Sequence, residues 1–147
     1  MFNIFNKFFS KKNINEQQTN NSLNNSIYRL IFEIITADHI IKDEEINITA
    51  ELLNKYFNYE EKQTSTELIK LKDENFFNSD LTKITLELKN ALSYEERVNL
   101  IKICWKVLLV DSNQDVLETA TVRRISILLG IEDRDFISIR NKIKGSQ

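Results

Sequence analysis

The sequence predicts an all-α fold. The 147-residue chain has no proline and only two glycines, Gly130 and Gly145, so it lacks the residues that usually form tight β-turns. Its apolar residues recur at the three- and four-residue spacing of amphipathic helices, and polar breaks separate segments of helical length. Hydrophobic residues make up 41% of the chain and charged residues 29%, which is an ordinary balance for one globular domain with a single core.

The first nine residues are predicted to form a short amphipathic segment. On a helical wheel its apolar side chains fall on one arc, opposite Asn, Lys and Ser side chains. Two interpretations stay open: the segment makes a peripheral contact with a membrane surface, or it docks on the protein's own body or on a second copy in a homodimer. The apolar arc consists of Phe2, Ile4, Phe5, Phe8 and Phe9.

Residues 10–25 are predicted to be a flexible linker. They are rich in Asn, Gln, Ser and Lys and contain too few apolar side chains to offset the entropy of ordering. The helical domain is therefore expected at residues 26–147. No apolar run in the chain approaches the roughly 20 residues that a helix needs to cross the hydrocarbon core of a membrane.

The first half of this domain is expected to contain four helices. Apolar residues from Ile27 onward follow one helical face, and this run stops at Asp38. A second helix begins after Asp43 as its N-cap, and residues 60–72 form a weak, mostly solvated helix. Asp80 caps the fourth helix.

The second half begins with the clearest helix start in the chain. Ser93 and Glu96 have the spacing of a capping box, and the helix that they open is apolar on most sides, which is typical of a central buried helix. Asp111 ends it. The next helix stops at Gly130, and a last helix starts at about Asp133.

One pattern occurs twice. An apolar helix ends at Asp38, and Glu45 follows seven positions later at the start of the next helix; Asp111 and Glu118 repeat this arrangement. The sequence therefore predicts two similar helix–acidic turn–helix halves. Each carboxylate taken singly is explained by helix capping and by the helix dipole, and the repeat also groups the carboxylates as candidate metal ligands.

The second acidic turn has the stronger metal-binding pattern. Asp111, Asn113 and Asp115 occupy the first, third and fifth places of a calcium-loop pattern, and such oxygen donors suit a hard cation. The full EF-hand motif is absent, because Val116 stands in place of the glycine and Val122 in place of the bidentate glutamate.

In the first turn, Lys42 stands where the second acidic residue would be, and its ammonium group opposes a cation. The predicted cofactor is a divalent metal ion of unknown identity. The candidate ligands are Asp111, Asp115, Glu118, Asp38 and Glu45.

Other site types find little support in the sequence. His39 is the single histidine and Cys104 the single cysteine, so one chain provides neither a histidine-rich zinc site nor an intrachain disulfide. A Cys–His nucleophilic pair would require both residues to meet in the fold. Residues 26–147 carry 17 basic and 21 acidic side chains, which argues against a nucleic acid partner. Arg123 and Arg124 are expected either to bind an anion or to pair with the acidic turns.

These residues resemble the TerB-like family, which comprises tellurite resistance protein B and its relatives and includes the N-terminal domain of the DjlA co-chaperone. The resemblance covers residues 27–143. It is carried by Ala37-Asp38 with Glu44-Glu45, Leu92-Ser93-Tyr94-Glu95-Glu96-Arg97, Trp105 with Val107, Asp111 with Asp115 and Glu118, Arg123-Arg124-Ile125, Leu128-Leu129-Gly130, and Asp135-Phe136 with Arg140.

The resemblance implies a compact bundle of about seven helices built from two similar halves, a divalent metal held by the acidic positions, and a role in tellurite or other stress responses. Lys42 and Ser112 depart from the family pattern, which usually has an acidic residue and glycine there. We expect a non-enzymatic, cytoplasmic bacterial domain with an unidentified protein partner. The alternative is a membrane-surface or co-chaperone-type adaptor, held at the inner face of the membrane by residues 1–9.

Overall fold

The computed structural model describes residues 14–36, 41–74, 80–110 and 116–145. These residues form seven helices and no strand, so the all-α prediction is confirmed. The helices are α2 (Ile14–Ile35), α3 (Asp43–Phe57), α4 (Glu61–Asp73), α5 (Leu81–Ala91), α6 (Tyr94–Val110), α7 (Val116–Leu128) and α8 (Asp133–Gly145).

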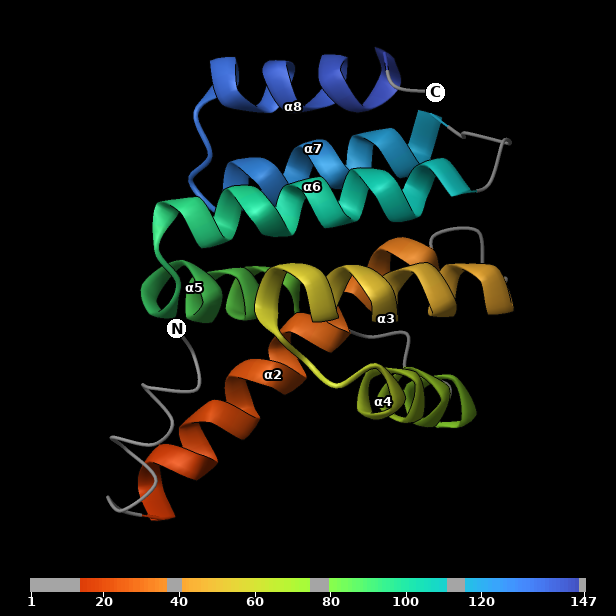
Figure 1. The fold of residues 1–147 in the computed structure, drawn as a ribbon. Coiled ribbons are helices and arrows are strands. Elements are labelled where there is room, and N and C mark those ends of the chain that lie inside the picture. The colour runs from red at the N-terminus through yellow and green to blue at the C-terminus, as the bar shows by residue number, and fades with distance from the viewer. Residues whose placement is uncertain (1–13, 37–40, 75–79, 111–115, 146–147) are drawn as a thin grey trace.

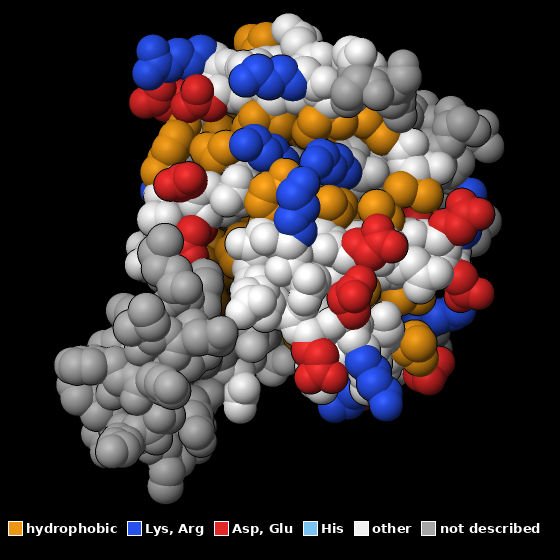
Figure 2. Space-filling model, viewed as in Figure 1, with side chains coloured by type: hydrophobic (Ala, Val, Ile, Leu, Met, Phe, Trp, Pro, Cys, Tyr) orange, Lys and Arg blue, Asp and Glu red, His pale blue; other side chains and the backbone are white. Residues whose placement is uncertain are grey.

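The helices stack in layers around α6 (Figure 1). α6 packs directly against α2, α3, α5, α7 and α8, while α4 is held by α2 and α3. Hydrophobic side chains are visible on one face of the molecule in a band over α6 and α7, interrupted by Lys and Arg side chains (Figure 2). The central position predicted for the helix that starts after Ser93 is therefore confirmed.

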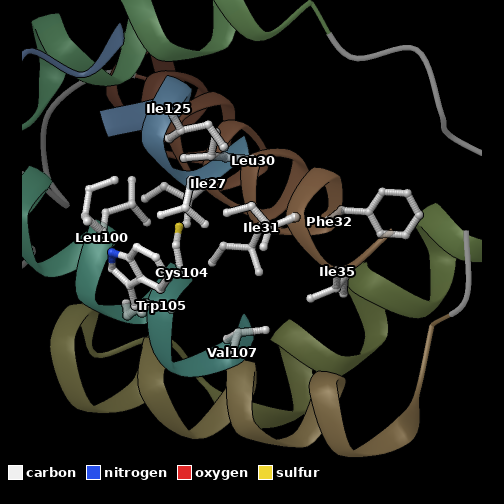
Figure 3. Close-up of a cluster of buried hydrophobic side chains, with 14 of the residues drawn as sticks. Ile27, Leu30, Ile31, Phe32, Ile35, Leu100, Cys104, Trp105, Val107 and Ile125 are labelled. Atoms are coloured by element: carbon white, nitrogen blue, oxygen red, sulfur yellow. The ribbon is translucent and has the colours of Figure 1, made fainter. Parts of the chain in front are cut away.

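The core is built mainly by α6 and the second half of α2 (Figure 3). Trp105 and Cys104 of α6 are fully buried beside Ile27 and Ile31 of α2, and Ile125 reaches the same cluster from α7. The helical periodicity of the sequence predicts these inward positions, because residues three and four apart share one face of a helix.

α2 is longer than the sequence predicts. It begins at Ile14, so residues 14–25 of the expected linker are helical. This segment has no proline or glycine to stop a helix, and adding residues to a helix that is already formed costs much less than nucleating a new one. Its first turns extend beyond the rest of the bundle (Figure 1). That the linker acts as a tether stays a prediction, and residues 1–9 lie outside the described residues.

Helix starts follow the predicted chemistry with one correction. The Ser93 Oγ accepts the Glu96 backbone N–H at 3.1 Å, and the Glu96 Oε1 accepts the Ser93 backbone N–H at 3.0 Å, which confirms the capping box. Asp80 caps α5 as predicted by accepting the Lys83 backbone N–H at 3.2 Å. Lys42, not Asp43, is the N-cap residue of α3.

α7 ends at Leu128, and Gly130 lies in the turn that stops it, as predicted. The Ile131 N–H donates to the Ser126 carbonyl and the Gly130 N–H donates to the Ile127 carbonyl, both at 3.0 Å, which is the Schellman arrangement. Gly130 has φ +71°, in the left-handed region that favours glycine. The chain reverses there and directs α8 back over α6 (Figure 1).

α4 is mostly solvated, as predicted: only Thr64, Leu68 and Leu71 of its residues are buried. Of the helices in the described part of the chain, none has both the length and the apolar content needed to cross a membrane.

Candidate functional site

The two acidic turns are flanked by helix ends on the same side of the molecule. α2 ends at Ile35 and α3 starts at Asp43; α6 ends at Val110 and α7 starts at Val116. All four ends point to the right in Figure 1. α3 packs on α6 and α2 packs on α7, so direct helix contacts fix how the two halves of the repeat are placed.

The structure describes only some of the predicted metal ligands. Asp38, Asp111 and Asp115 lie outside the described residues. Glu118 is the third residue of α7, and its side chain is also outside the described part. Glu45 is described, and it is the third residue of α3, so the two glutamates of the repeat hold the same helical position.

Glu45 has a capping role in the first half. Its side chain is buried, with 6% of its surface exposed, and its Oε1 accepts the Lys42 backbone N–H at 3.1 Å. The Glu45 N–H in turn donates to the Lys42 carbonyl at 3.1 Å. The carboxylate therefore satisfies a backbone amide that would otherwise be unpaired at the helix start. This is the helix-capping role that was considered above as the alternative to metal binding.

The ionisable residues that the structure describes do not form a second candidate centre. The described segments contain no group of three or more His, Cys, Asp or Glu side chains placed to share a metal ion. Cys104 is completely buried, and this burial raises the pKa of its thiol from 9.0 to about 12. The thiol is therefore protonated at neutral pH and is a poor nucleophile. His39, the other member of the Cys–His pair considered above, lies outside the described residues.

Arg123 and Arg134 form ion pairs with acidic residues at the connection between α7 and α8. Arg123 Nη2 lies 2.6 Å from Asp133 Oδ1, and Arg134 Nε lies 3.1 Å from Glu132 Oε2. The Arg123 guanidinium also lies over the Phe136 ring, 4.6 Å from its centroid. Arg123 was expected to bind an anion or to pair with the acidic turns; its described carboxylate partner is instead Asp133, the first residue of α8.

Two residues of α6 whose contacts sequence reasoning missed, Tyr94 and Arg97, hold this same turn against α6. The Tyr94 hydroxyl donates to the Asp135 carboxylate and accepts the Glu132 N–H at 3.1 Å. Arg97 Nη1 donates to the carbonyl of Leu129, one of the last carbonyls of the α7 end. These residues were noticed only as part of the family pattern, because contacts between residues more than 30 positions apart leave no local signal in a sequence.

Sequence reasoning also missed a group of basic residues around Tyr56. Lys106 Nζ donates to the Tyr56 hydroxyl at 3.4 Å, and Lys55 Nζ lies 5.2 Å from the centre of the same ring. The spacing of Lys102 and Lys106, four residues apart on an apolar helix, is the one sequence signal that points to it.

Comparison with known proteins identifies one family. The family model described as tellurite resistance protein TerB matches residues 25–141, which includes all the helices except the N-terminal part of α2 and the last turn of α8. Neither the curated proteins nor the solved structures contain a significant match to the chain.

Proposed function

The chain belongs to the family of tellurite resistance protein TerB, and we propose that it is a non-enzymatic, stress-associated domain that binds a divalent metal through its acidic turns. Asp111, Asp115 and Glu118 would hold the ion, together with Asp38 and Glu45. Bound metal would supply a fixed positive charge that ties the two halves of the repeat together.

The shared placement of the helix ends carries this proposal. The ends that flank both turns lie on one side of the bundle, so the fold is compatible with carboxylates from the two turns acting together (Figure 1). The donor chemistry fits as well, because carboxylate and amide oxygens are the ligands that hard divalent cations prefer.

The burial of the single cysteine supports a non-enzymatic role. Cys104, the strongest nucleophile type in the chain, is buried among apolar side chains and has a raised pKa. A catalytic thiol needs the opposite environment, with a lowered pKa and access to substrate.

Metal-dependent stabilisation tests the proposal. Thermal melts of the full chain are recorded with Ca²⁺, Mg²⁺, Zn²⁺ or a chelator, and a ligand at 100 times its Kd should stabilise the folded state by about 2.7 kcal/mol. The Asp111→Asn/Asp115→Asn variant should lose this shift. The Asp73→Asn/Glu74→Gln variant is the matched control, because both side chains are exposed at the end of α4. No shift with any metal, or an equal shift in both variants, would refute the metal role.

The membrane-surface adaptor is the second candidate, and the shape of α2 favours it. α2 is continuous from Ile14 to Ile35, and its first turns extend away from the other helices (Figure 1). A membrane anchor joined to the N-terminal end of α2 would be separated from the other helices by the length of those turns. Flotation with liposomes should recover the full chain but not a version that starts at residue 14; equal recovery of the two would exclude anchoring by residues 1–9.

A further inference from the structure

The ammonium groups of two lysines lie against the ring of one tyrosine on α3, Tyr56. Lys106 Nζ is 5.5 Å from the centre of the Tyr56 ring and also donates to its hydroxyl, while Lys55 Nζ is 5.2 Å from the same ring centre. The ring therefore gathers a cation from α6 and one from α3. Two like charges at one ring repel each other, so positive charge is concentrated at this point of the surface.

The positive charge continues onto the neighbouring helices. Lys102 lies one turn before Lys106 on α6, and Arg140 lies one turn before Lys144 on α8. Lys144 Nζ is 5.8 Å from the centre of the Trp105 ring, which places this end of α8 directly over α6. We call these five residues the basic face: Lys55, Lys102, Lys106, Arg140 and Lys144.

The basic face is not neutralised by the described part of the protein. None of its five residues has a described carboxylate oxygen within 4.0 Å, whereas Arg123 and Arg134 do have such partners. Like charges one helical turn apart also destabilise a helix slightly, and both α6 and α8 contain such a pair. The chain as a whole has a net charge of −2, so this surface has the opposite sign to the protein that carries it.

Apolar groups accompany these charges. Tyr56, Val98 and Ile143 are partly buried hydrophobic residues that pack against the core at α3, α6 and α8. Lys and Arg side chains are seen within a band of hydrophobic side chains on this face, and acidic side chains lie beside the band (Figure 2). On α3, Glu51 is exposed one turn before Lys55.

We propose that the basic face binds an acidic, partly apolar segment of a partner protein. Such a segment lies along α6 with its carboxylates on the lysines and its apolar side chains on Tyr56 and Val98. A narrow segment avoids the acidic residues at the edge of the face, whereas a flat anionic membrane would be pressed against exposed Glu51 as well. The proposal concerns a different set of residues from the acidic turns and does not depend on metal binding.

Charge reversal with a matched control tests the proposal. The probe is a fluorescein-labelled peptide of alternating Glu and Leu, whose binding to the full chain is followed by fluorescence anisotropy at about 50 mM NaCl. Wild type should bind the peptide, and binding should weaken as salt is added. Lys102→Glu/Lys106→Glu should weaken binding by about tenfold or more. Lys62→Glu/Lys70→Glu makes the same change of charge at exposed positions of α4 and should stay within about twofold of wild type.

Three results would overturn the proposal: no binding by wild type, equal loss in both double variants, or binding to vesicles of phosphatidylcholine and phosphatidylserine through the basic face with none to the peptide. Thermal melts show whether each variant is folded. If Lys102→Glu/Lys106→Glu does not fold, Lys55→Glu/Lys144→Glu replaces it, because both of those side chains are exposed. This second variant must then lose peptide binding for the proposal to stand.

Discussion

Replacing Gly130 with alanine should destabilise the protein through one backbone position. Gly130 has φ +71°, and an L residue in this region costs about 1–2 kcal/mol. A Cβ atom there would lie 3.0 Å from Lys89 Cε and 3.2 Å from Arg97 Nη1. Lys89 has a flexible end that moves at little cost, but Arg97 Nη1 is held by the Leu129 carbonyl.

The strain in the folded state is partly offset by an effect of the substitution on the unfolded chain. Alanine restricts the unfolded chain more than glycine does, which returns about 0.4–1 kcal/mol to the folded state. The net loss should therefore be about 1 kcal/mol, and for a chain of this size it lowers Tm by about 2–4 °C. Displacing Arg97 would add to this loss.

The chain supplies its own control, because its only other glycine is Gly145. A Cβ atom at Gly145 meets nothing within 4 Å, and this residue ends α8 without a positive φ. Thermal and urea unfolding of Gly130→Ala and Gly145→Ala are followed by circular dichroism at the helical band. An unchanged Tm for Gly130→Ala, or an equal fall for Gly145→Ala, would show that strain at the end of α7 is not what selects glycine there.

Three further predictions concern helix caps and burial. Ser93→Ala should cost about 1 kcal/mol in urea unfolding, because the Glu96 N–H loses its acceptor, whereas Ser65→Ala within α4 should be nearly neutral. Asn58 has φ 59° after the end of α3, so Asn58→Ala should lower stability by about 1 kcal/mol and Asn58→Gly should not. Burial raises the pKa of Cys104 from 9.0 to about 12, so the unfolded thiol ionises first and stability is lost as pH rises from 9 to 12. The urea midpoint should fall less over this range in Cys104→Ala. Burial also raises the pKa of Tyr59, which lowers stability above pH 10 in both proteins, so their difference isolates the thiol. Parallel curves for the two proteins would contradict the assignment to Cys104.

Local signals in the sequence predict most of the fold. Ser93 and Glu96 predict the start of α6 because a capping box is a short-range pattern. Gly130 likewise predicts the end of α7, because a glycine just after a helix is also a short-range pattern. The start of α2 was not predicted, since the Asn, Ser and Thr residues that dominate this segment have only moderate helix propensities and give no clear signal. Lys42 was missed as the α3 cap because the acidic residues that follow it all suit the first turn of a helix.

Long-range contacts explain what the sequence did not reveal about sites. Tyr56 and Lys106 are 50 positions apart, and only the packing of α3 against α6 brings them together. The repeat did identify the helix ends that share one side of the molecule, because it is a local pattern that occurs twice. No local pattern states whether a carboxylate caps a helix or faces a ligand, and Glu45 illustrates this: its capping contact depends on the backbone of Lys42.

The capping role of Glu45 sharpens the choice of variants at the second turn. Glu45 and Glu118 are both third residues of their helices, so Asp115, which directly precedes α7, corresponds to the N-cap residue Lys42. Asp at an N-cap stabilises a helix without any metal, and a truncation to alanine would remove both roles at once. Asparagine is an equally good N-cap but lacks the negative charge that a divalent cation requires. Asp115→Asn therefore removes the charge and keeps a side chain that caps helices equally well, so a loss of metal-dependent stabilisation in this variant is attributable to the ion and not to the helix.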